Sequence, residues 1–240
     1  MGAAWARNGV DAMTNFWFGP LGGTIELYSL FSPRSFSPVL WLKLDDGSGT
    51  TPQDSSGNGN HATFVDTPTW GSGYLEFDGA NDGLNVAYHA SLAPEHITVM
   101  GWLWIPAAQS NLDTFIARAY DGTTQPYYAH VSATGSMDFG TFGASSVNVA
   151  GQTALPTETW VHVAATHSGS EYRIWRNAVS DGVNADTTAL QTNTEPLNIG
   201  YLNVNGTPGR FLGCRAHDIL IFPSALTQEQ IAAVMAVTEL

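Results

Sequence analysis

Residues 160–177 read Trp-Val-His-Val-Ala-Ala-Thr-His, then Ser-Gly-Ser-Glu, then Tyr-Arg-Ile-Trp-Arg-Asn. Two β-prone segments therefore flank a short loop that contains one glycine, which is typical of a β-hairpin. Side chains alternate between the two sides of a strand, so Tyr172 and Ile174 share one face and Arg173 and Trp175 share the other. This hairpin indicates an antiparallel sheet, and the chain on either side of it continues the same pattern.

Short β-prone segments separated by Gly, Asn, Asp and Pro occur along most of the remaining chain. Such spacing predicts an all-β fold, an antiparallel two-sheet sandwich. One helix is predicted to begin at Thr227, because Thr227 and Gln230 have the spacing of a capping box ahead of apolar Ile231 and Val234. We expect strands over residues 39–45, 61–65, 74–78, 84–88, 97–105, 114–120, 126–132, 136–142, 160–167, 172–177, 196–202 and 215–222.

The composition describes an acidic chain that can fold. Its 240 residues include 8 Lys and Arg against 21 Asp and Glu, for a formal net charge of −13. The 43% hydrophobic content is enough for a sizeable core. A protein that reads duplex nucleic acid needs a basic surface, which so few basic residues cannot supply. We therefore expect no direct binding to nucleic acid or to anionic lipid.

Residues 1–38 differ from residues 39–240 in charge and in content. The first segment has two acids and two bases, so the second carries the whole net charge. Gly and Pro interrupt the aromatic residues of the first segment too often for a core of its own. It is expected either to pack as a strand on the sandwich or to act as an arm that docks on another subunit. The candidate docking residues are Trp5, Phe16, Trp17, Phe18, Tyr28 and Phe31.

Residues 54–60 read Asp-Ser-Ser-Gly-Asn-Gly-Asn and place oxygen-bearing side chains at positions 54, 56, 58 and 60. Hard cations bind several such oxygens on a flexible loop. Val65 stands where a helix-loop-helix calcium site has its bidentate Glu, so the loop is not an EF-hand. Two interpretations stay open: a turn closed by Asx-type hydrogen bonds and a structural calcium site.

Seven motifs, taken in order, resemble the laminin-G-like, concanavalin A-like jelly-roll family over about residues 39–238. The resemblance implies two packed antiparallel sheets with a concave face, in a family whose members mostly bind glycans, proteins or calcium. Residues 1–38 lie outside it. The motifs are Leu-Lys-Leu-Asp-Asp-Gly-Ser-Gly-Thr-Thr (42–51), Asp-Ser-Ser-Gly-Asn-Gly-Asn-His-Ala-Thr (54–63), Leu-Glu-Phe-Asp-Gly (75–79), Ile-Thr-Val-Met-Gly-Trp-Leu-Trp (97–104), Trp-Val-His-Val-Ala-Ala-Thr (160–166), Leu-Asn-Ile-Gly (197–200) and Ile-Leu-Ile-Phe-Pro-Ser-Ala-Leu-Thr-Gln-Glu-Gln-Ile (219–231).

The resemblance bears on the metal site. The family usually has an acidic pair ahead of its last strand, and aligning on Ala225-Leu226 puts His217 and Asp218 there. The first acid is therefore missing, and His is a poor ligand for calcium. The calcium site that the sequence still allows consists of Asp54, Asn58 and Asp218.

Glycoside hydrolysis is the main enzymatic alternative, since laminarinase-type glycosidases share this architecture. Retaining hydrolysis needs two carboxyl groups about 5 to 5.5 Å apart, which those enzymes place on a Glu-x-Asp-x-Glu strand. Here Glu76-Phe77-Asp78 is followed by Gly79-Ala80, so the second Glu is absent. His162 and His167 are five residues apart on a predicted strand and face opposite sides, so they are no same-strand ligand pair. We expect a non-catalytic protein.

Tryptophan is a common platform for sugars, because its apolar ring face matches the C–H face of a pyranose. Trp102 and Trp104 share one strand face, as do Arg173 and Trp175, so either pair could line a glycan groove. The single Cys214 excludes a disulfide and is expected to be a small buried apolar residue.

Two functions stay open at this point. The first is a module of a bacteriophage virion surface, a head decoration or tail-associated adhesin, anchored by residues 1–38 to other virion subunits. It would be a homo-oligomer that touches host glycans. The second is an extracellular carbohydrate-binding module that assists a glycan-active enzyme. Neither a secretion-signal pattern nor an apolar run of membrane-spanning length is apparent in the sequence, so we expect no membrane insertion.

Overall fold

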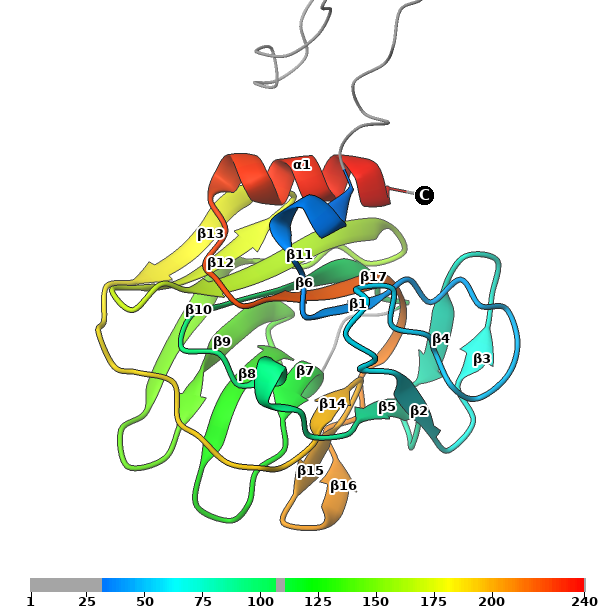
Figure 1. Cartoon of the computed structure of the whole chain (residues 1–240), viewed down its shortest axis with the longest axis horizontal. Helices are drawn as coiled ribbons and strands as arrows, with labels where there is room; N and C mark the ends of the chain where they lie inside the picture. The colour runs from blue at the N-terminus through cyan, green and yellow to red at the C-terminus, as the bar shows by residue number, and fades with distance from the viewer. Residues whose placement is uncertain (1–31, 107–110, 240) are drawn as a thin grey trace, which may run out of the picture.

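The computed structural model describes residues 32–106 and 111–239. Within these ranges the chain folds into two antiparallel β-sheets that pack face to face, with an α-helix on the outside (Figure 1). The predicted fold class, an antiparallel two-sheet sandwich of the concanavalin A-like jelly-roll type with a short C-terminal helix, is confirmed.

The first sheet has eight strands. They are Leu40–Leu42 (β1), Thr69–Trp70 (β3), Leu75–Asp78 (β4), Ile97–Trp104 (β6), Trp160–His167 (β11), Tyr172–Arg176 (β12), Val179–Asn184 (β13) and Gly213–Phe222 (β17). Their order across the sheet is β13-β12-β11-β6-β17-β4-β3, and β1 pairs with β17 outside this path.

The second sheet has seven strands. They are Ala62–Val65 (β2), Gly83–Val86 (β5), Asp113–Arg118 (β7), Gln125–Val131 (β8), Ser136–Phe142 (β9), Val147–Ala154 (β10) and Leu197–Ile199 (β14). Their order is β10-β9-β8-β7-β14-β5-β2. A separate hairpin is formed by Leu202–Val204 (β15) and Thr207–Gly209 (β16), and short 3-10 helices span Pro33–Phe36 (η3) and Ala90–Leu92 (η4).

Each strand segment predicted from the sequence overlaps an observed strand. The hairpin over residues 160–177 is confirmed, since β11 and β12 pair antiparallel from Val163–Arg176 to His167–Tyr172. Strands β3, β10, β13, β15 and β16 were not predicted. They bury few side chains: β10, for example, buries Val147 and Val149 and exposes most of the remainder. Strands with so little apolar alternation give a weak sequence signal.

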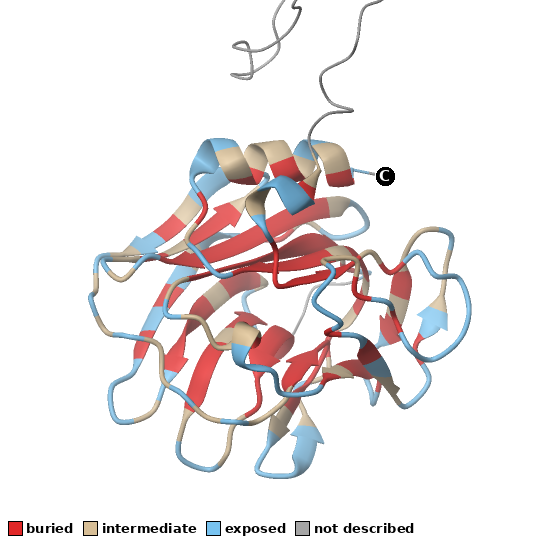
Figure 2. Cartoon of the chain, viewed as in Figure 1, coloured by how far each residue is buried: buried red, intermediate tan, exposed pale blue. Residues whose placement is uncertain are grey.

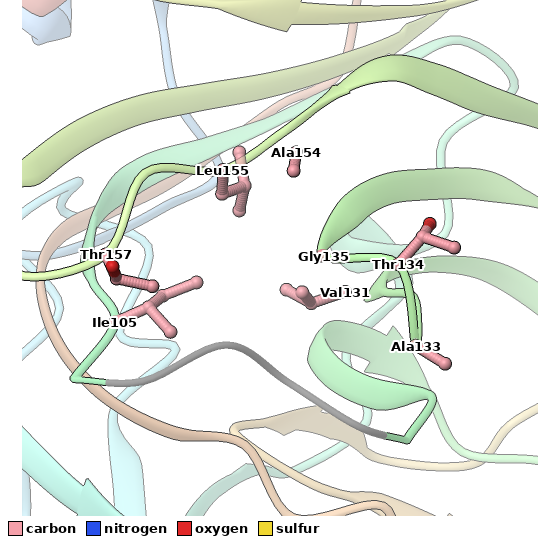
Figure 3. A pocket seen from close by; sticks show the side chains of 8 residues that line it. All are labelled: Ile105, Val131, Ala133, Thr134, Gly135, Ala154, Leu155 and Thr157. Atoms are coloured by element: carbon pink, nitrogen blue, oxygen red, sulfur yellow. The ribbon is translucent and has the colours of Figure 1, made fainter.

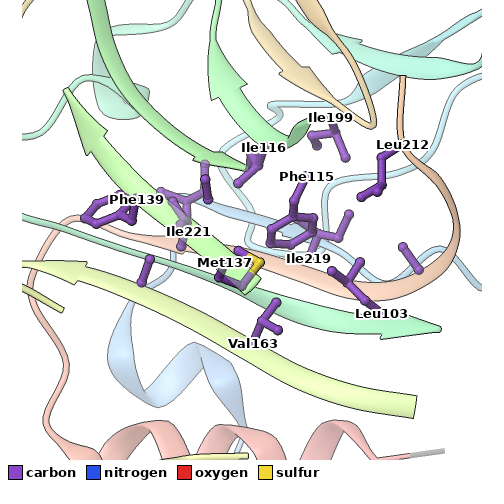
Figure 4. Packing of buried hydrophobic residues seen from close by; sticks show 14 of the residues in the cluster. Leu103, Phe115, Ile116, Met137, Phe139, Val163, Ile199, Leu212, Ile219 and Ile221 are labelled. Atoms are coloured by element: carbon purple, nitrogen blue, oxygen red, sulfur yellow. The ribbon is translucent and has the colours of Figure 1, made fainter. Parts of the chain in front are cut away.

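The core lies between the two sheets, where the inner faces of both contribute aliphatic and aromatic side chains (Figure 2). Leu103, Val163 and Ile219 from the eight-stranded sheet meet Phe115 and Phe139 from the other sheet (Figure 4). Cys214 is also buried in this core, as predicted. Burial of apolar surface is the main force that holds the two layers together.

The helix Gln228–Thr238 (α1) packs on the outer face of the eight-stranded sheet (Figure 1). Its predicted start is confirmed: Thr227 is the N-cap, and Thr227 and Gln230 form the complete capping box. Ile231 and Val234 form a second apolar cluster with sheet residues that include Trp175. Within the described ranges, the chain has no helix with the length and hydrophobicity needed to span a bilayer.

The last part of the predicted N-terminal arm, from Ser32, contacts the sandwich. Phe36 packs against the apolar cluster under α1, and Arg34 Nε donates to the carbonyl oxygen of Ser55 at 3.0 Å. The candidate docking residues lie outside the described residues; they are Trp5, Phe16, Trp17, Phe18, Tyr28 and Phe31.

Candidate functional site

The helix α1 covers two of the four residues predicted to bind glycans. Trp102 is 7% exposed and Trp175 is 8% exposed. Trp102 Nε1 donates to Thr238 Oγ1 at the end of the helix, at 3.1 Å, and the Trp102 ring stacks on His217. Neither indole ring therefore presents an open face on which a sugar could stack.

The other two residues, Trp104 and Arg173, lie on the same outer face of the eight-stranded sheet. The Arg215 guanidinium lies 4.4 Å from the centre of the Trp104 ring. Arg173 forms an ion pair with Glu171 at 2.8 Å and lies over the Trp175 ring at 5.3 Å. The strand-face prediction agrees with this placement, but these side chains line neither of the two cavities described below.

The Asp54 loop is closed by hydrogen bonds. Asp54 Oδ1 accepts from the backbone N–H groups of Trp41 (3.0 Å) and Ser56 (2.9 Å), and Oδ2 accepts from Ser56 Oγ (2.8 Å) and Asn60 N (2.9 Å). The Asn58 amide donates to the carbonyl oxygen of Pro38 at 3.1 Å. Asp54 thus makes the Asx-type contacts of the first interpretation.

Asp218 contacts the indole N–H of Trp41, whereas Asp54 contacts the Trp41 backbone N–H. Asp218 Oδ1 accepts from Trp41 Nε1 at 2.6 Å, and its Oδ2 lies 3.1 Å from His217 Nδ1. Among residues 32–106 and 111–239, no group of three or more His, Cys, Asp and Glu side chains is arranged to hold a metal ion. Calcium binding by Asp54, Asn58 and Asp218 stays a prediction, and nothing below depends on it.

A small cavity of about 120 Å³ opens at one end of the sandwich (Figure 3). Val131, at the end of β8, projects into it together with Ile105 and Leu155, which directly follow β6 and β10, and Thr134 and Thr157 supply its side-chain hydroxyl groups. No charged or titratable side chain of the described residues lines it. Its polar side chains among the described residues are the two threonines, so it offers fewer groups to orient a polar ligand than the larger cavity described next.

A larger cavity, of about 480 Å³, lies on the outer face of the seven-stranded sheet, away from α1. This volume is within the range of small-molecule sites in proteins. We call it the sheet groove. It is lined by Leu112, Tyr120, Gln125, Tyr128, His130, Asp138, Phe142, Asn148, Leu202, Val204 and Arg210.

The alternation of side chains along β8 and β9 determines which residues form the floor of the sheet groove. In β8, Tyr127, Ala129 and Val131 belong to the core, so Tyr128 and His130 face outward. In β9, Met137 and Phe139 belong to the core, so Asp138 and Phe142 face outward. The registers pair His130 with Asp138, and Tyr128 with Gly140.

A β-bulge adds Gln125 to this floor. The pairing of β8 with β9 shifts between Tyr128–Gly140 and Gln125–Phe142, so β8 has one residue more than β9 over this interval. The extra residue turns Gln125 to the same face as Tyr128, which simple alternation would not do. Bulges often re-aim side chains in this way beside functional sites.

Aromatic rings form the walls of the groove. Tyr120 and Phe142 meet edge to face, with ring centres 5.7 Å apart, and Phe142 is 48% exposed. The Tyr128 ring stacks on the His130 ring at 4.6 Å. Gly140 makes room for Tyr128, because a Cβ at this position would lie 2.8 Å from the Tyr128 hydroxyl and would overlap the carbonyl oxygen of Val147.

The charge state of the floor follows from burial. Desolvation, followed by the positive charge of Arg210, lowers the pKa of His130 to about 3, so this ring is neutral at pH 7. Desolvation, with the charge of Asp138 as a second cause, raises the pKa of Tyr128 to about 12. Desolvation also raises the pKa of Asp138. His130 and Tyr128 are therefore neutral at pH 7, and they lie beside the cationic Arg210.

Several polar atoms at this floor or beside it have no partner among the described residues. Gln125 Nε2, His130 Nδ1 and Thr114 Oγ1 are buried and make no hydrogen bond to the described residues. Thr114 pairs with His130 across β7 and β8. Buried polar groups without partners are rare in folded proteins and often mark a place where water or a ligand binds. The arrangement can bind a polar, partly apolar molecule by stacking and hydrogen bonding.

The sequence did not predict any residue of this groove as a site. A signal was present in β8, where Tyr128 and His130 alternate with apolar residues, but the same pattern fits any half-exposed strand. Part of the lining, Leu202, Val204 and Arg210, comes from a segment far along the chain. The prediction that His162 and His167 face opposite sides is confirmed, since His162 contacts Trp102 on the outer face and His167 contacts the core residue Tyr172.

Comparison with known families and structures agrees with the observed fold. Residues 77–232 match the family model described as the concanavalin A-like lectin/glucanases superfamily. No curated protein was found to match the sequence.

Solved structures of similar fold cover most of this chain. The botulinum neurotoxin serotype C1 binding domain is 12% identical over 87% of this chain, with a TM-score of 0.68, and this chain spans 53% of its length. Domain 4 of AbnA, a GH43 extracellular arabinanase from Geobacillus stearothermophilus, in complex with arabinotriose, is 15% identical over 85% of this chain and 98% of its own, with a TM-score of 0.66. The Trypanosoma rangeli sialidase is 12% identical over 82% of this chain and 32% of its own, with a TM-score of 0.63. At these identities the likeness shows the fold.

Proposed function

The chain belongs to the concanavalin A-like lectin/glucanases superfamily, and from this premise we propose that it is a non-catalytic saccharide-binding module whose ligand lies in the sheet groove. One observation carries the proposal: an open cavity of about 480 Å³ that combines aromatic walls with buried, unpartnered polar atoms. A sugar needs both, because each ring has apolar C–H faces and a rim of hydroxyl groups.

The groove supplies partners for each part of a sugar. The exposed Phe142 ring, braced by Tyr120, offers an apolar face for stacking. Asn148 and Gln125 offer amide groups, and Arg210 offers guanidinium donors, to the hydroxyl rim. These groups are held by strands and by a paired hairpin, so little order has to be gained on binding.

The absence of catalysis is proposed from the acids of the groove. Asp138 is the single carboxylate among the described residues that line it. Retaining and inverting glycosidases both need a pair of carboxyl groups across the scissile bond. Two of the similar structures support a binding role in this fold, since their descriptions name a toxin binding domain and an arabinanase domain in complex with arabinotriose.

Truncating the groove wall is the direct test. We expect Phe142→Ala to weaken saccharide binding by about tenfold, because loss of an aromatic stacking face costs about 1 to 1.5 kcal/mol. The ligand is first chosen from a glycan array that includes arabinotriose, and affinities are then measured by isothermal titration calorimetry. Unfolding of each variant in urea confirms that the sandwich is intact.

Two matched variants make this test specific. Val183→Ala removes an apolar side chain of similar exposure (51%) from β13 of the other sheet, and it should bind like the parent. Trp104→Ala tests the tryptophan face that the sequence predicted. If Trp104→Ala abolishes binding and Phe142→Ala does not, the ligand lies on the eight-stranded sheet and the groove proposal is wrong. A chain that binds no saccharide on the array has another role.

We propose further that residues 1–31 attach the module to a larger assembly, with a virion surface as the setting. The support comes from the sequence: an aromatic-rich segment with a formal charge of −1 (Arg7 against Asp11 and Glu26) precedes a strongly acidic body. An extracellular module that accompanies a glycan-active enzyme is the alternative setting, and both display the groove outside a cell.

Deleting residues 1–31 separates the two settings. The boundary keeps Phe36, which packs under α1, so the sandwich should still fold. We expect the shortened chain to lose self-association in analytical ultracentrifugation while it keeps the saccharide affinity of the full chain. If the full chain is monomeric, or if the deletion leaves its assembly unchanged, residues 1–31 are not a docking arm.

A further inference from the structure

Arg210 stands out among the cations of this acidic chain. It lines the sheet groove and is exposed, and its backbone has φ 52°, a left-handed conformation that non-glycine residues rarely adopt. The carbonyl oxygen of Arg210 accepts from Thr114 N at 2.9 Å, which holds this conformation against β7. Strain of this kind is often retained where a side chain has a function.

The guanidinium of Arg210 has no acidic partner in the described part of the chain. The three ion pairs found there are Arg173–Glu171, Arg215–Glu76 and His217–Asp218. The Arg210 side chain contacts His130 instead, with Arg210 Nη1 at 3.5 Å from His130 Nε2. A guanidinium has five N–H donors in a fixed plane, so most of the donors of Arg210 are left for a ligand.

The same contact determines which ring nitrogen of His130 carries the proton. Because a guanidinium can only donate, His130 Nε2 accepts, and the proton of the neutral ring lies on Nδ1. His130 is 2% exposed and Gln125 is 6% exposed, and both have a buried nitrogen without a partner. The groove therefore has unpaired hydrogen-bond donors of two kinds: the exposed guanidinium of Arg210, and the buried His130 Nδ1–H and Gln125 Nε2–H.

We propose that the sheet groove selects a saccharide that carries a carboxylate, with the carboxylate bound at Arg210; this inference rests on the proposed saccharide-binding function. A planar guanidinium and a carboxylate form two parallel charge-assisted hydrogen bonds, stronger than bonds to a neutral hydroxyl. A uronic acid or a similar acidic sugar unit supplies the carboxylate and the apolar ring face together.

The remaining charges limit the ligand to one acidic unit. Asp138 lies on the same floor, one strand from His130, and the whole chain has a formal net charge of −13. A polyanion would be repelled along most of its length, whereas one carboxylate at Arg210 keeps a favourable local partner. Replacing Asp138 by Asn removes the nearest negative charge and should strengthen binding of the acidic sugar.

The test uses glycan pairs that differ at one group. Glucose and glucuronic acid, galactose and galacturonic acid, mannose and mannuronic acid, each within an otherwise identical disaccharide, are probed on an array and then by calorimetry with the full chain. We expect the acidic member of the bound pair to bind at least about tenfold more tightly than the neutral one. Arg210→Gln should reduce this preference to near unity, and Asp138→Asn should increase it.

Controls keep the outcomes distinct. Arg173→Gln, an arginine on the other sheet, should leave the preference unchanged, and urea unfolding confirms that each variant folds. Equal binding of both members of every pair, or preference for the neutral member, overturns the carboxylate inference and leaves the saccharide-binding function in place. Binding of none of the pairs, with no other glycan bound on the array, overturns both. Tighter binding of polygalacturonate than of the acidic disaccharide overturns the limit to one acidic unit.

Discussion

Arg118→Met is expected to lower the free energy of unfolding by about 3 to 5 kcal/mol. Arg118 ends β7 and is fully buried, and burial lowers the pKa of its guanidinium. In the described part of the chain no carboxylate lies within ion-pair distance of it. Its nitrogens instead donate to backbone carbonyl oxygens: Nε to Glu195 (2.8 Å), Nη1 to Leu92 (3.1 Å) and Nη2 to Asn193 (3.0 Å).

The large effect has a simple cause. Arg118 holds two connecting segments, around residues 92 and 193–195, against the edge of the core. Methionine fills much of the same volume but donates no hydrogen bond, so several carbonyl oxygens would be left unsatisfied. Tyr127 Oη also donates to the Leu92 carbonyl oxygen, at 3.0 Å, so that one acceptor keeps a partner.

Guanidinium denaturation followed by tryptophan fluorescence measures this loss. Arg173→Met is the matched control, because the Arg173 side chain is 24% exposed and its ion pair with Glu171 lies at the surface, where such pairs contribute less than about 1 kcal/mol. A loss below about 1 kcal/mol for Arg118→Met would mean that these buried hydrogen bonds do not stabilise the fold.

Acid is expected to destabilise the protein through His162. This ring is fully buried on the outer face of the eight-stranded sheet, edge-on to Trp102, and neither ring nitrogen has a partner among the described residues. Desolvation, with nearby His217 as a second cause, lowers the pKa of His162 to about 3. An unfolded chain has the ordinary histidine pKa of about 6.5.

The direction follows from these two pKa values. Between about pH 6.5 and pH 3 the unfolded chain binds a proton at this histidine and the folded chain does not, so stability falls as the pH falls. Above pH 6.5 the ring is neutral in both states and contributes no pH dependence. The loss is about 1.4 kcal/mol for each pH unit below 6.5, which amounts to about 2 kcal/mol at pH 5.

His162→Phe should remove this contribution. Phenylalanine keeps an aromatic ring beside Trp102 and removes the two unpartnered nitrogens, so we expect a stability at pH 5 about 2 kcal/mol above that of the parent. His89→Phe, at an exposed position, should keep the parent's pH dependence. Denaturation curves from pH 4 to 8 give the result, and parallel curves for parent and His162→Phe would exclude His162 as the cause.

The sequence predicted the secondary-structure elements better than it predicted an accessible binding site. The hairpin at residues 160–177 and the helix start at Thr227 were predicted correctly because their signals are local: alternation, a turn glycine and a capping box. Trp102 was predicted to share a strand face with Trp104, and Trp175 with Arg173; neither Trp102 nor Trp175 belongs to the core between the sheets. The sequence could not show that α1, more than fifty residues later, packs over them.

The groove could not be predicted from the sequence either, because its residues are also brought together by tertiary structure. Gln125 reaches the groove floor only because of a β-bulge, and no residue type in the sequence indicates where a bulge of this kind occurs. Arg210 reaches the same floor because the chain that follows the β15–β16 hairpin returns to β7.

The sequence by itself determined the layers of this protein, the sandwich and its capped helix, because spacing along the chain decides which side chains can be buried together. It also determined the acidic character, a formal net charge of −13, from which we expect no binding to nucleic acid. Tertiary structure alone decided which outer face is open. One face is closed by α1, and the other is left with aromatic rings, unpartnered polar atoms and Arg210, brought together from segments distant in the chain. Burial and charge at such a place depend on neighbours in space, and a linear order of residues does not specify those neighbours.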